Sequence, residues 1–140
     1  MAELLARKLE TILVVDDTDE VLKVVVSILE IAKFHVLKAT SGPNALELAA
    51  NHAGRIDLLL SDVQMPGMSG PDLGEALKRS RPDIHVMLMS GFTGENLLAL
   101  NHRWAYIQKP FVPVKLLEMI NVVLHTQPGD RRVVTSARYA

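Results

Sequence analysis

Acidic, hydroxyl and basic side chains follow most of the short apolar runs in this sequence, at the points where the runs end. Asp16 and Asp17 follow the first run, Asp62 the third, Ser90 the fourth and Lys109 the fifth. Oxygen ligands without histidine or cysteine select a hard cation, Mg²⁺ or Mn²⁺. A lysine and a hydroxyl beside them are suited to holding the oxygens of a phosphoryl group, and a carboxylate can act as the nucleophile. The residue types therefore indicate phosphoryl transfer at a divalent-metal site.

The elements that must position these side chains are five apolar runs that alternate with segments of helical periodicity. The runs predict strands at residues 11–15, 35–39, 56–60, 84–89 and 104–108. The other segments predict helices at residues 21–32, 43–49, 71–80, 95–101 and 112–126, with Thr18 or Asp19 capping the first. This alternation implies a doubly wound α/β fold, with helices on both faces of a parallel sheet. Because ligands bind beyond the carboxyl ends of such strands, we expect the chemical side chains to meet at one rim.

Length and composition predict one soluble domain. The chain has 140 residues, 49% hydrophobic and 22% charged, and its net charge of −1 gives no field that favours nucleic acid or an anionic membrane. It has no cysteine, which excludes disulfides and thiolate nucleophiles and fits a cytoplasmic location. No apolar run approaches the roughly 20 residues that span a bilayer, and residues 1–10 do not form a secretory signal. We expect a lead at residues 1–10, a domain at 11–127 and a flexible tail at 128–140.

Four motifs, each at the end of a predicted strand, resemble those of receiver domains of response regulators in two-component signal transduction systems. The segments that carry the resemblance are residues 12–17 (ILVVDD), 57–70 (DLLLSDVQMPGMSG), 87–91 (MLMSG) and 106–111 (YIQKPF). Each motif alone is of moderate specificity, but the four in this order are highly specific, and the likeness covers residues 11–126. The resemblance implies a flavodoxin-like (βα)5 fold, whose five-stranded parallel sheet has the strand order 2-1-3-4-5.

The resemblance also implies roles for the site residues. Asp62 is expected to be the phosphoacceptor, and Asp16, Asp17, Asp62 and the backbone carbonyl of Gln64 are expected to bind Mg²⁺, with Mn²⁺ as an alternative. The first acid of the pair often acts through water in this family. Lys109 is expected to pair with the acceptor or with its phosphoryl group, and the peptide bond that follows Lys109 is expected to be cis.

A switch and a set of partners follow from the same resemblance. On phosphorylation Ser90 is expected to turn toward a phosphoryl oxygen and Tyr106 to follow into the vacated space. This movement would change the face made by the fourth helix, fifth strand and fifth helix, which is also a possible homodimer interface. The phosphodonor would be a sensor histidine kinase or a histidine phosphotransfer protein, and the chain itself would bind no nucleic acid and no membrane. The segment 91–104 is short for the family, and Trp104 in it is a candidate partner contact.

Two other functions fit parts of the sequence. A haloacid-dehalogenase-like phosphatase would use Asp17 and Asp19 as its Asp-x-Asp motif, but it would leave Asp62 without a role and would need a longer chain. A receiver-like interaction module that does not cycle phosphate would fit the short segment 91–104 but not the complete acidic site. We expect a regulatory switch that promotes its own phosphorylation and dephosphorylation, and not an enzyme that acts on a separate substrate.

Overall fold

A parallel sheet forms the middle layer of the computed structural model, which describes residues 9–91 and 104–125. The strands in the described residues are β1 (Thr11–Val15), β2 (His35–Ala39), β3 (Leu58–Asp62), β4 (His85–Ser90) and β5 (Ala105–Gln108). They lie in the order β2-β1-β3-β4-β5, and every neighbouring pair is parallel. The strand order with β1 inside the sheet requires a crossover in each direction, so the predicted doubly wound, flavodoxin-like architecture is confirmed.

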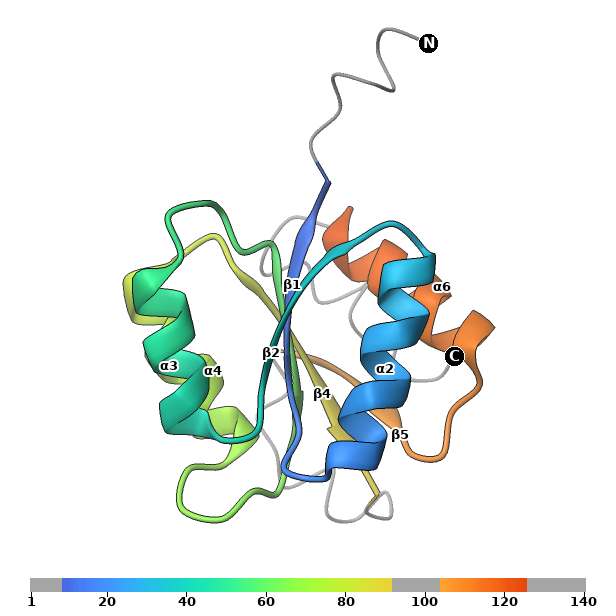
Figure 1. Ribbon diagram of the computed structural model, residues 1–140, viewed down its shortest axis with the longest axis horizontal. Helices are drawn as coiled ribbons and strands as arrows, with labels where there is room; N and C mark the ends of the chain where they lie inside the picture. The colour runs from blue at the N-terminus through green and yellow to red at the C-terminus, as the bar shows by residue number, and fades with distance from the viewer. Residues whose placement is uncertain (1–8, 92–103, 126–140) are drawn as a thin grey trace, which may run out of the picture.

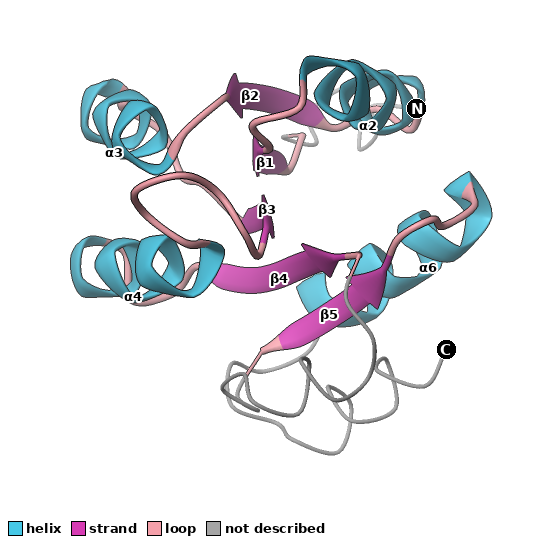
Figure 2. Ribbon diagram, turned by 90° about the horizontal axis from the view of Figure 1, so that it is seen from below, coloured by secondary structure: helices cyan, strands magenta, loops and turns pink. Residues whose placement is uncertain are grey.

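Helices cover both faces of this sheet, as Figures 1 and 2 show. On one face lie α2 (Asp19–Ile31) and α6 (Pro113–Leu124), and on the other lie α3 (Gly42–Asn51) and α4 (Gly70–Ser80). The helix predicted at 95–101 falls outside the described residues. None of the helices described is long and apolar enough to cross a membrane.

The core consists of two apolar clusters, one on each face of the sheet. Successive side chains of a strand point to opposite faces, so Ile12 and Val14 join the cluster under α2 and α6, while Leu13 and Val15 join the cluster under α3 and α4. All five residues of β1 are buried, which explains why this strand reads as a continuous apolar run and not as an alternating one.

The boundaries of β3 and β4 differ from the prediction in one informative way. The sequence places the strand ends before the first polar residue, but β3 runs on to Asp62 and β4 to Ser90. The ladder continues because Asp62 pairs with Met89 across the sheet. Sheet hydrogen bonds therefore hold the backbone of the last residues of these strands, which fixes the positions from which their side chains extend at the rim.

Serine side chains cap two of the helices. Ser41 accepts a hydrogen bond from the backbone N–H of Asn44 at the start of α3, and Ser69 accepts one from Asp72 at the start of α4, both at 3.1 Å. Thr18 occupies the cap position of α2, but its side chain makes no capping hydrogen bond. The predicted position of the cap is therefore confirmed, and what binds at this position is the backbone N–H of Thr18, which donates to Oδ1 of Asp16.

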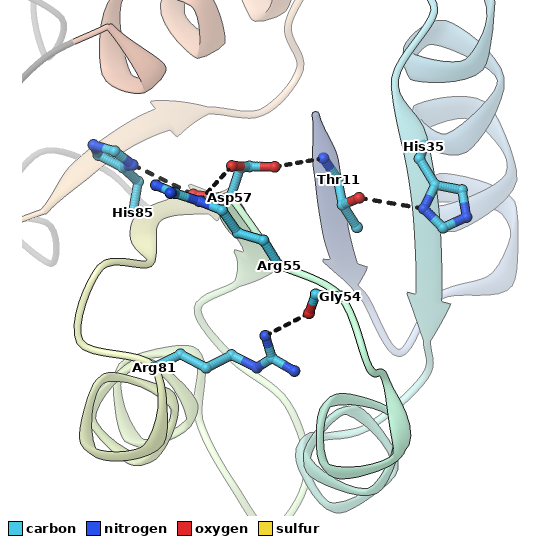
Figure 3. Close-up of polar contacts among 7 residues, drawn as sticks. All are labelled: Thr11, His35, Gly54, Arg55, Asp57, Arg81 and His85. Atoms are coloured by element: carbon cyan, nitrogen blue, oxygen red, sulfur yellow. Dashed lines mark hydrogen bonds and ion pairs between the residues drawn. The ribbon is translucent and has the colours of Figure 1, made fainter. Parts of the chain in front are cut away.

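Asp57 ties three strands together at the opposite, amino-terminal rim of the sheet (Figure 3). One carboxylate oxygen accepts from the backbone N–H of Thr11 at 2.8 Å, and the other pairs with Nε of Arg55 at 2.8 Å. The backbone N–H of Asp57 donates to Thr11 at 2.8 Å, and its carbonyl accepts from the N–H of His85 at 3.1 Å. One residue thus fixes where β1, β3 and β4 begin.

Arg81 joins the ends of α3 and α4 at the same rim. Its guanidinium donates to the carbonyl oxygens of Ala49, His52 and Gly54, each at 2.9 Å (the contact to Gly54 is drawn in Figure 3). These carbonyls lie at and beyond the end of α3, where helical partners run out, and that of Ala49 also accepts from the backbone N–H of His52. The planar, five-donor guanidinium therefore fastens two helices that are adjacent in space but separated by β3 in the chain.

We predict that Asp57→Ala lowers the free energy of unfolding by about 1–3 kcal/mol, because it leaves the partly buried N–H of Thr11 without its acceptor. Urea denaturation followed by circular dichroism measures this. The matched control is Asp83→Ala, an exposed carboxylate near the same rim, which should change the free energy by no more than about 0.5 kcal/mol. Equal effects of the two substitutions would contradict the role given to Asp57.

Candidate functional site

Three carboxylates meet at the carboxyl rim of the sheet. Asp16 and Asp17 follow β1, Asp62 ends β3, and these two strands are neighbours in the sheet. One oxygen from each carboxylate lies within 4.8 Å of the others. Asp16 is fully buried, Asp62 is half-buried and Asp17 is exposed. The prediction that these side chains converge at one rim is confirmed.

Lys109 places its ammonium group between two of these carboxylates. Its Nζ lies 2.9 Å from Oδ2 of Asp16 and 3.4 Å from Oδ1 of Asp62. Its backbone N–H donates to the carbonyl of Ser90 at 2.7 Å, which anchors the loop after β5 to the end of β4. The peptide bond to Pro110 is cis, as predicted. The lysine therefore pairs with the acceptor candidate as expected, but its shorter contact is to Asp16.

Both oxygens of Asp16 are already bound. Oδ2 accepts from Lys109, and Oδ1 accepts from the backbone N–H of Thr18 at 2.9 Å. The second bond holds the start of α2 close to the rim. Asp16 is thus a fixed, buried charge, while Asp17 and Asp62 present oxygens toward solvent.

Burial and the neighbouring charges together raise the pKa values of Asp62 and Lys109. Burial raises the pKa of Asp62, and the negative charges of Asp16 and Asp17 add to this, while the ammonium of Lys109 opposes it. Burial by itself lowers the pKa of Lys109, but the hydrogen bond to Asp16 and the charge of Asp62 outweigh it, so the net pKa is raised. Lys109 is therefore a cation at neutral pH, and one positive charge faces three carboxylates.

Ser90 and Tyr106 lie on the adjoining strands. Ser90 is buried at the end of β4, one residue beyond the partner of Asp62 in the sheet. Tyr106 is half-buried in β5 opposite Leu88, and it packs against the cluster under α3 and α4. Ser90 and Leu88 point to the same face of β4, so the two candidate switch residues lie on one side of the sheet.

A shallow cavity of about 420 Å³ opens beside the carboxylates. It is lined by Asp17, Gln64, Met65, Pro66 and Ser69. Gln64 is exposed in the loop after β3, so this loop and Asp17 form two walls of the entrance to the rim. The space is large enough for a phosphoryl group with its bound water.

Two features of the site were not predicted from the sequence. Gly70 starts α4 against the backbone of Asp62: a Cβ at this position would overlap the carbonyl oxygen of Asp62. The N–H of Gly70 also donates to the carbonyl of Val63 at 2.8 Å. The sequence signal that could have indicated this contact was a glycine placed between a loop and a helical segment.

The expectation that Trp104 is a partner contact was wrong, because Trp104 is 7% exposed and packs on Gly74 of α4.

This arrangement defines a class of protein: an α/β domain with an acidic, lysine-bearing rim suited to phosphoryl transfer. The model of the response regulator receiver domain matches residues 12–121, so the chain belongs to this family. A phosphorylation-dependent regulatory switch of two-component signalling fits a member of this family, and neither the phosphatase nor the non-cycling interaction module is favoured.

Relatives and solved structures agree with this assignment. The chain is 32% identical over 120 residues to sensor kinase CckA of Brucella abortus, covering 84% of this chain and 13% of that protein. It is 31% identical over 129 residues to response regulator SaeR of Staphylococcus aureus, covering 86% of this chain and 55% of SaeR. A CheY-like receiver domain from Methanospirillum hungatei superposes with a TM-score of 0.74 at 33% identity, covering 84% of this chain and 94% of that one. The receiver domain of hybrid histidine kinase CckA superposes with a TM-score of 0.71 at 34% identity, covering 82% and 99%.

We predict that Asp62→Asn stabilises the domain in divalent-free buffer at neutral pH, by about 0.5–1 kcal/mol because solvent still screens part of the charge. The pKa of Asp62 is raised in the folded state, so its ionised form destabilises the fold above that pKa. The gain should therefore disappear as the pH falls below the ordinary value of 3.8. Urea denaturation across this pH range measures the difference, with Asp83→Asn as an exposed control. A gain that grows toward acid pH would contradict the stated electrostatics.

Proposed function

We propose that Asp62 accepts a phosphoryl group from a phosphohistidine, and that the other rim residues support this transfer. The observation that carries the proposal is the convergence of Asp16, Asp17 and Asp62 with Lys109 at the carboxyl ends of β1, β3 and β5. In the transfer the P–N bond of the phosphohistidine breaks as an oxygen of Asp62 forms a P–O bond. The products are an acyl phosphate on Asp62 and a free histidine on the donor.

The donor set fits a divalent cation. It consists of carboxylate oxygens, with no thiolate or imidazole among the clustered groups, which is the chemistry that Mg²⁺ and Mn²⁺ prefer. Asp17 and Asp62 would hold the ion directly, with the backbone carbonyl of Gln64, while Asp16 would act through water because both its oxygens already accept hydrogen bonds. The ion would neutralise charge on the phosphoryl oxygens when bound.

Lys109 and Ser90 supply the remaining contacts in this proposal. The ammonium of Lys109, already 3.4 Å from the acceptor carboxylate, would move from that oxygen to a phosphoryl oxygen. Ser90 would donate its hydroxyl to another phosphoryl oxygen, and Tyr106 would repack on the same side of the sheet. The added charge of about −1.5 to −2 would shift the population between the two packings and so change partner binding.

An apolar groove marks where the phosphodonor would dock. It has a volume of about 500 Å³ and is lined mainly by Val21 and Val24 of α2 and by Phe111, with Lys109 at its edge. Val21, Val24, Ile28 and Ile31 recur at intervals of three and four residues, and Val24 and Ile31 are 58% and 79% exposed. This spacing suits a helical partner. A helix of the phosphodonor that docks in this groove would bring the donor's histidine to the rim where Asp62 lies.

The wider context is also a proposal. The phosphodonor would be a sensor histidine kinase or a histidine phosphotransfer protein. The receiver domain would comprise residues 11–127. Its location would be the cytoplasm. A homodimer would use the face made by β5, α6 and the helix predicted at 95–101, which lies outside the described residues. The chain spans about half the length of SaeR and about an eighth of CckA.

We predict that acetyl phosphate with Mg²⁺ adds one phosphoryl group to the wild-type domain, and that peptide mass spectrometry locates it at Asp62. Asp62→Asn should abolish the modification, and Lys109→Ala should reduce its rate by at least about tenfold, because the charge that stabilises the transferring oxygens is lost. The exposed Lys33→Ala serves as the control and should leave the rate unchanged. A phosphoryl group on another residue, or an unchanged yield in Asp62→Asn, would refute the proposal.

We predict that Val24→Asp slows phosphotransfer from a protein donor by at least about tenfold, because it places a charge in the apolar groove. The donor is chosen from autophosphorylated histidine kinase cores as the one that phosphorylates the wild type fastest. Modification by acetyl phosphate should stay within about twofold of the wild type, since the rim is untouched. Ala50→Asp, on the exposed side of α3, is the matched control. Equal slowing with both donors would place the defect in the chemistry and not in docking.

A further inference from the structure

We propose that Trp104 and Gly74 form a latch that carries the phosphorylation state of Asp62 through α4 to β5, by a route separate from Ser90 and Tyr106. Trp104 is a positioning residue in this proposal, since it does not touch the reacting groups. The inference rests on the proposed role of Asp62 and deepens it by naming how the signal leaves the acceptor.

In this contact the indole ring of Trp104 packs against α4 at Gly74, where the helix has no side chain. Gly74 lies inside α4, away from both ends, where glycine is among the least favourable residues. A Cβ at this position would meet Cη2 of Trp104 at 2.9 Å, Cζ3 of the same ring at 3.0 Å and Cγ1 of Val86 at 3.3 Å. The indole therefore occupies the space that a side chain would need, and the two residues are matched in shape.

The same helix touches the acceptor. Gly70 begins α4 so close to Asp62 that a Cβ would overlap the acceptor's carbonyl oxygen. Gly74 follows four residues later, about 6 Å along the helix. A movement of the backbone at Asp62 would therefore displace α4, and this displacement would reach the indole directly, because a close-packed contact does not absorb it.

The indole in turn leads to the output strand. Trp104 directly precedes β5, and two residues later Tyr106 packs in the same cluster under α3 and α4. Ala105 and Ile107, between and beyond them, belong to the cluster on the other face. The side chains of Trp104 and Tyr106 thus lie on the same face of the sheet, at its β5 edge. In the latch as proposed, this packing of Trp104 on Gly74 belongs to the unphosphorylated state and holds β5 in place.

The first test uses the tryptophan as its own reporter, because the chain contains only one. Beryllofluoride with Mg²⁺ should change the intensity or wavelength of the Trp104 emission in the wild type and leave it unchanged in Asp62→Asn. Unchanged emission in a wild type that acetyl phosphate demonstrably modifies at Asp62 would overturn the latch and leave the proposed function standing. No modification and no emission change would overturn both.

The second test separates coupling from stability. Gly74→Ala should displace the ring and tighten the apparent affinity for beryllofluoride by about threefold or more, because the unphosphorylated packing is loosened. Trp104→Leu should act in the same direction, and the double variant should show no further gain. Ala76→Gly, on the same helix but away from Trp104, should lower the urea midpoint without changing the affinity. An affinity in Gly74→Ala equal to the wild type, or a matching shift in Ala76→Gly, would refute the latch.

Discussion

The ion pairs of Lys109 with Asp16 and Asp62 are the interactions on which the site depends. Three carboxylates within 4.8 Å of one another repel, and burial raises the pKa of Asp62 further. The lysine offsets part of that repulsion, and it comes from the far end of the chain. The order of strands is what makes this possible, because β1 and β3 are neighbours while the loop after β5 returns over the same rim. The remaining imbalance of charge is what a divalent ion would neutralise.

Aspartate side chains lie at both rims of the sheet, but they have different roles at the two rims. At the amino rim, Asp57 satisfies both its oxygens with Thr11 and Arg55, and Arg81 saturates the carbonyls at the end of α3. Nothing in that arrangement calls for a ligand, since every charge named has a partner inside the protein. At the carboxyl rim, Asp17 is exposed and oxygens are left facing solvent. Residue type alone therefore does not separate a structural aspartate from a functional one; the location in the fold and the partners do.

Much of this was accessible from the sequence, and the exceptions have physical causes. The strand order followed from the resemblance to receiver domains. The meeting of Asp16, Asp17, Asp62 and Lys109 followed from their places at strand ends, because parallel strands all finish at one rim. The ends of β1, β2 and β5 were predicted correctly, but those of β3 and β4 were placed two residues and one residue early, since polarity marks a rim but pairing decides where a strand stops. The burial of Trp104 could not be read locally, because it depends on a glycine thirty residues earlier in the chain whose only signal is the absence of a side chain.

The contact between Gly70 and the backbone of Asp62 also constrains how the connecting loop can vary. The loop leaves β3 at Asp62 and must return to place a residue without a Cβ against that same carbonyl. Its exposed side chains, such as those of Gln64 and Pro66, can vary, whereas Ser69 caps α4 and Met65 is buried. The residue at its end is not free to vary, because a Cβ at position 70 would overlap the carbonyl oxygen of Asp62. Relatives that keep this close approach of α4 to β3 should therefore keep glycine at the first residue of the helix.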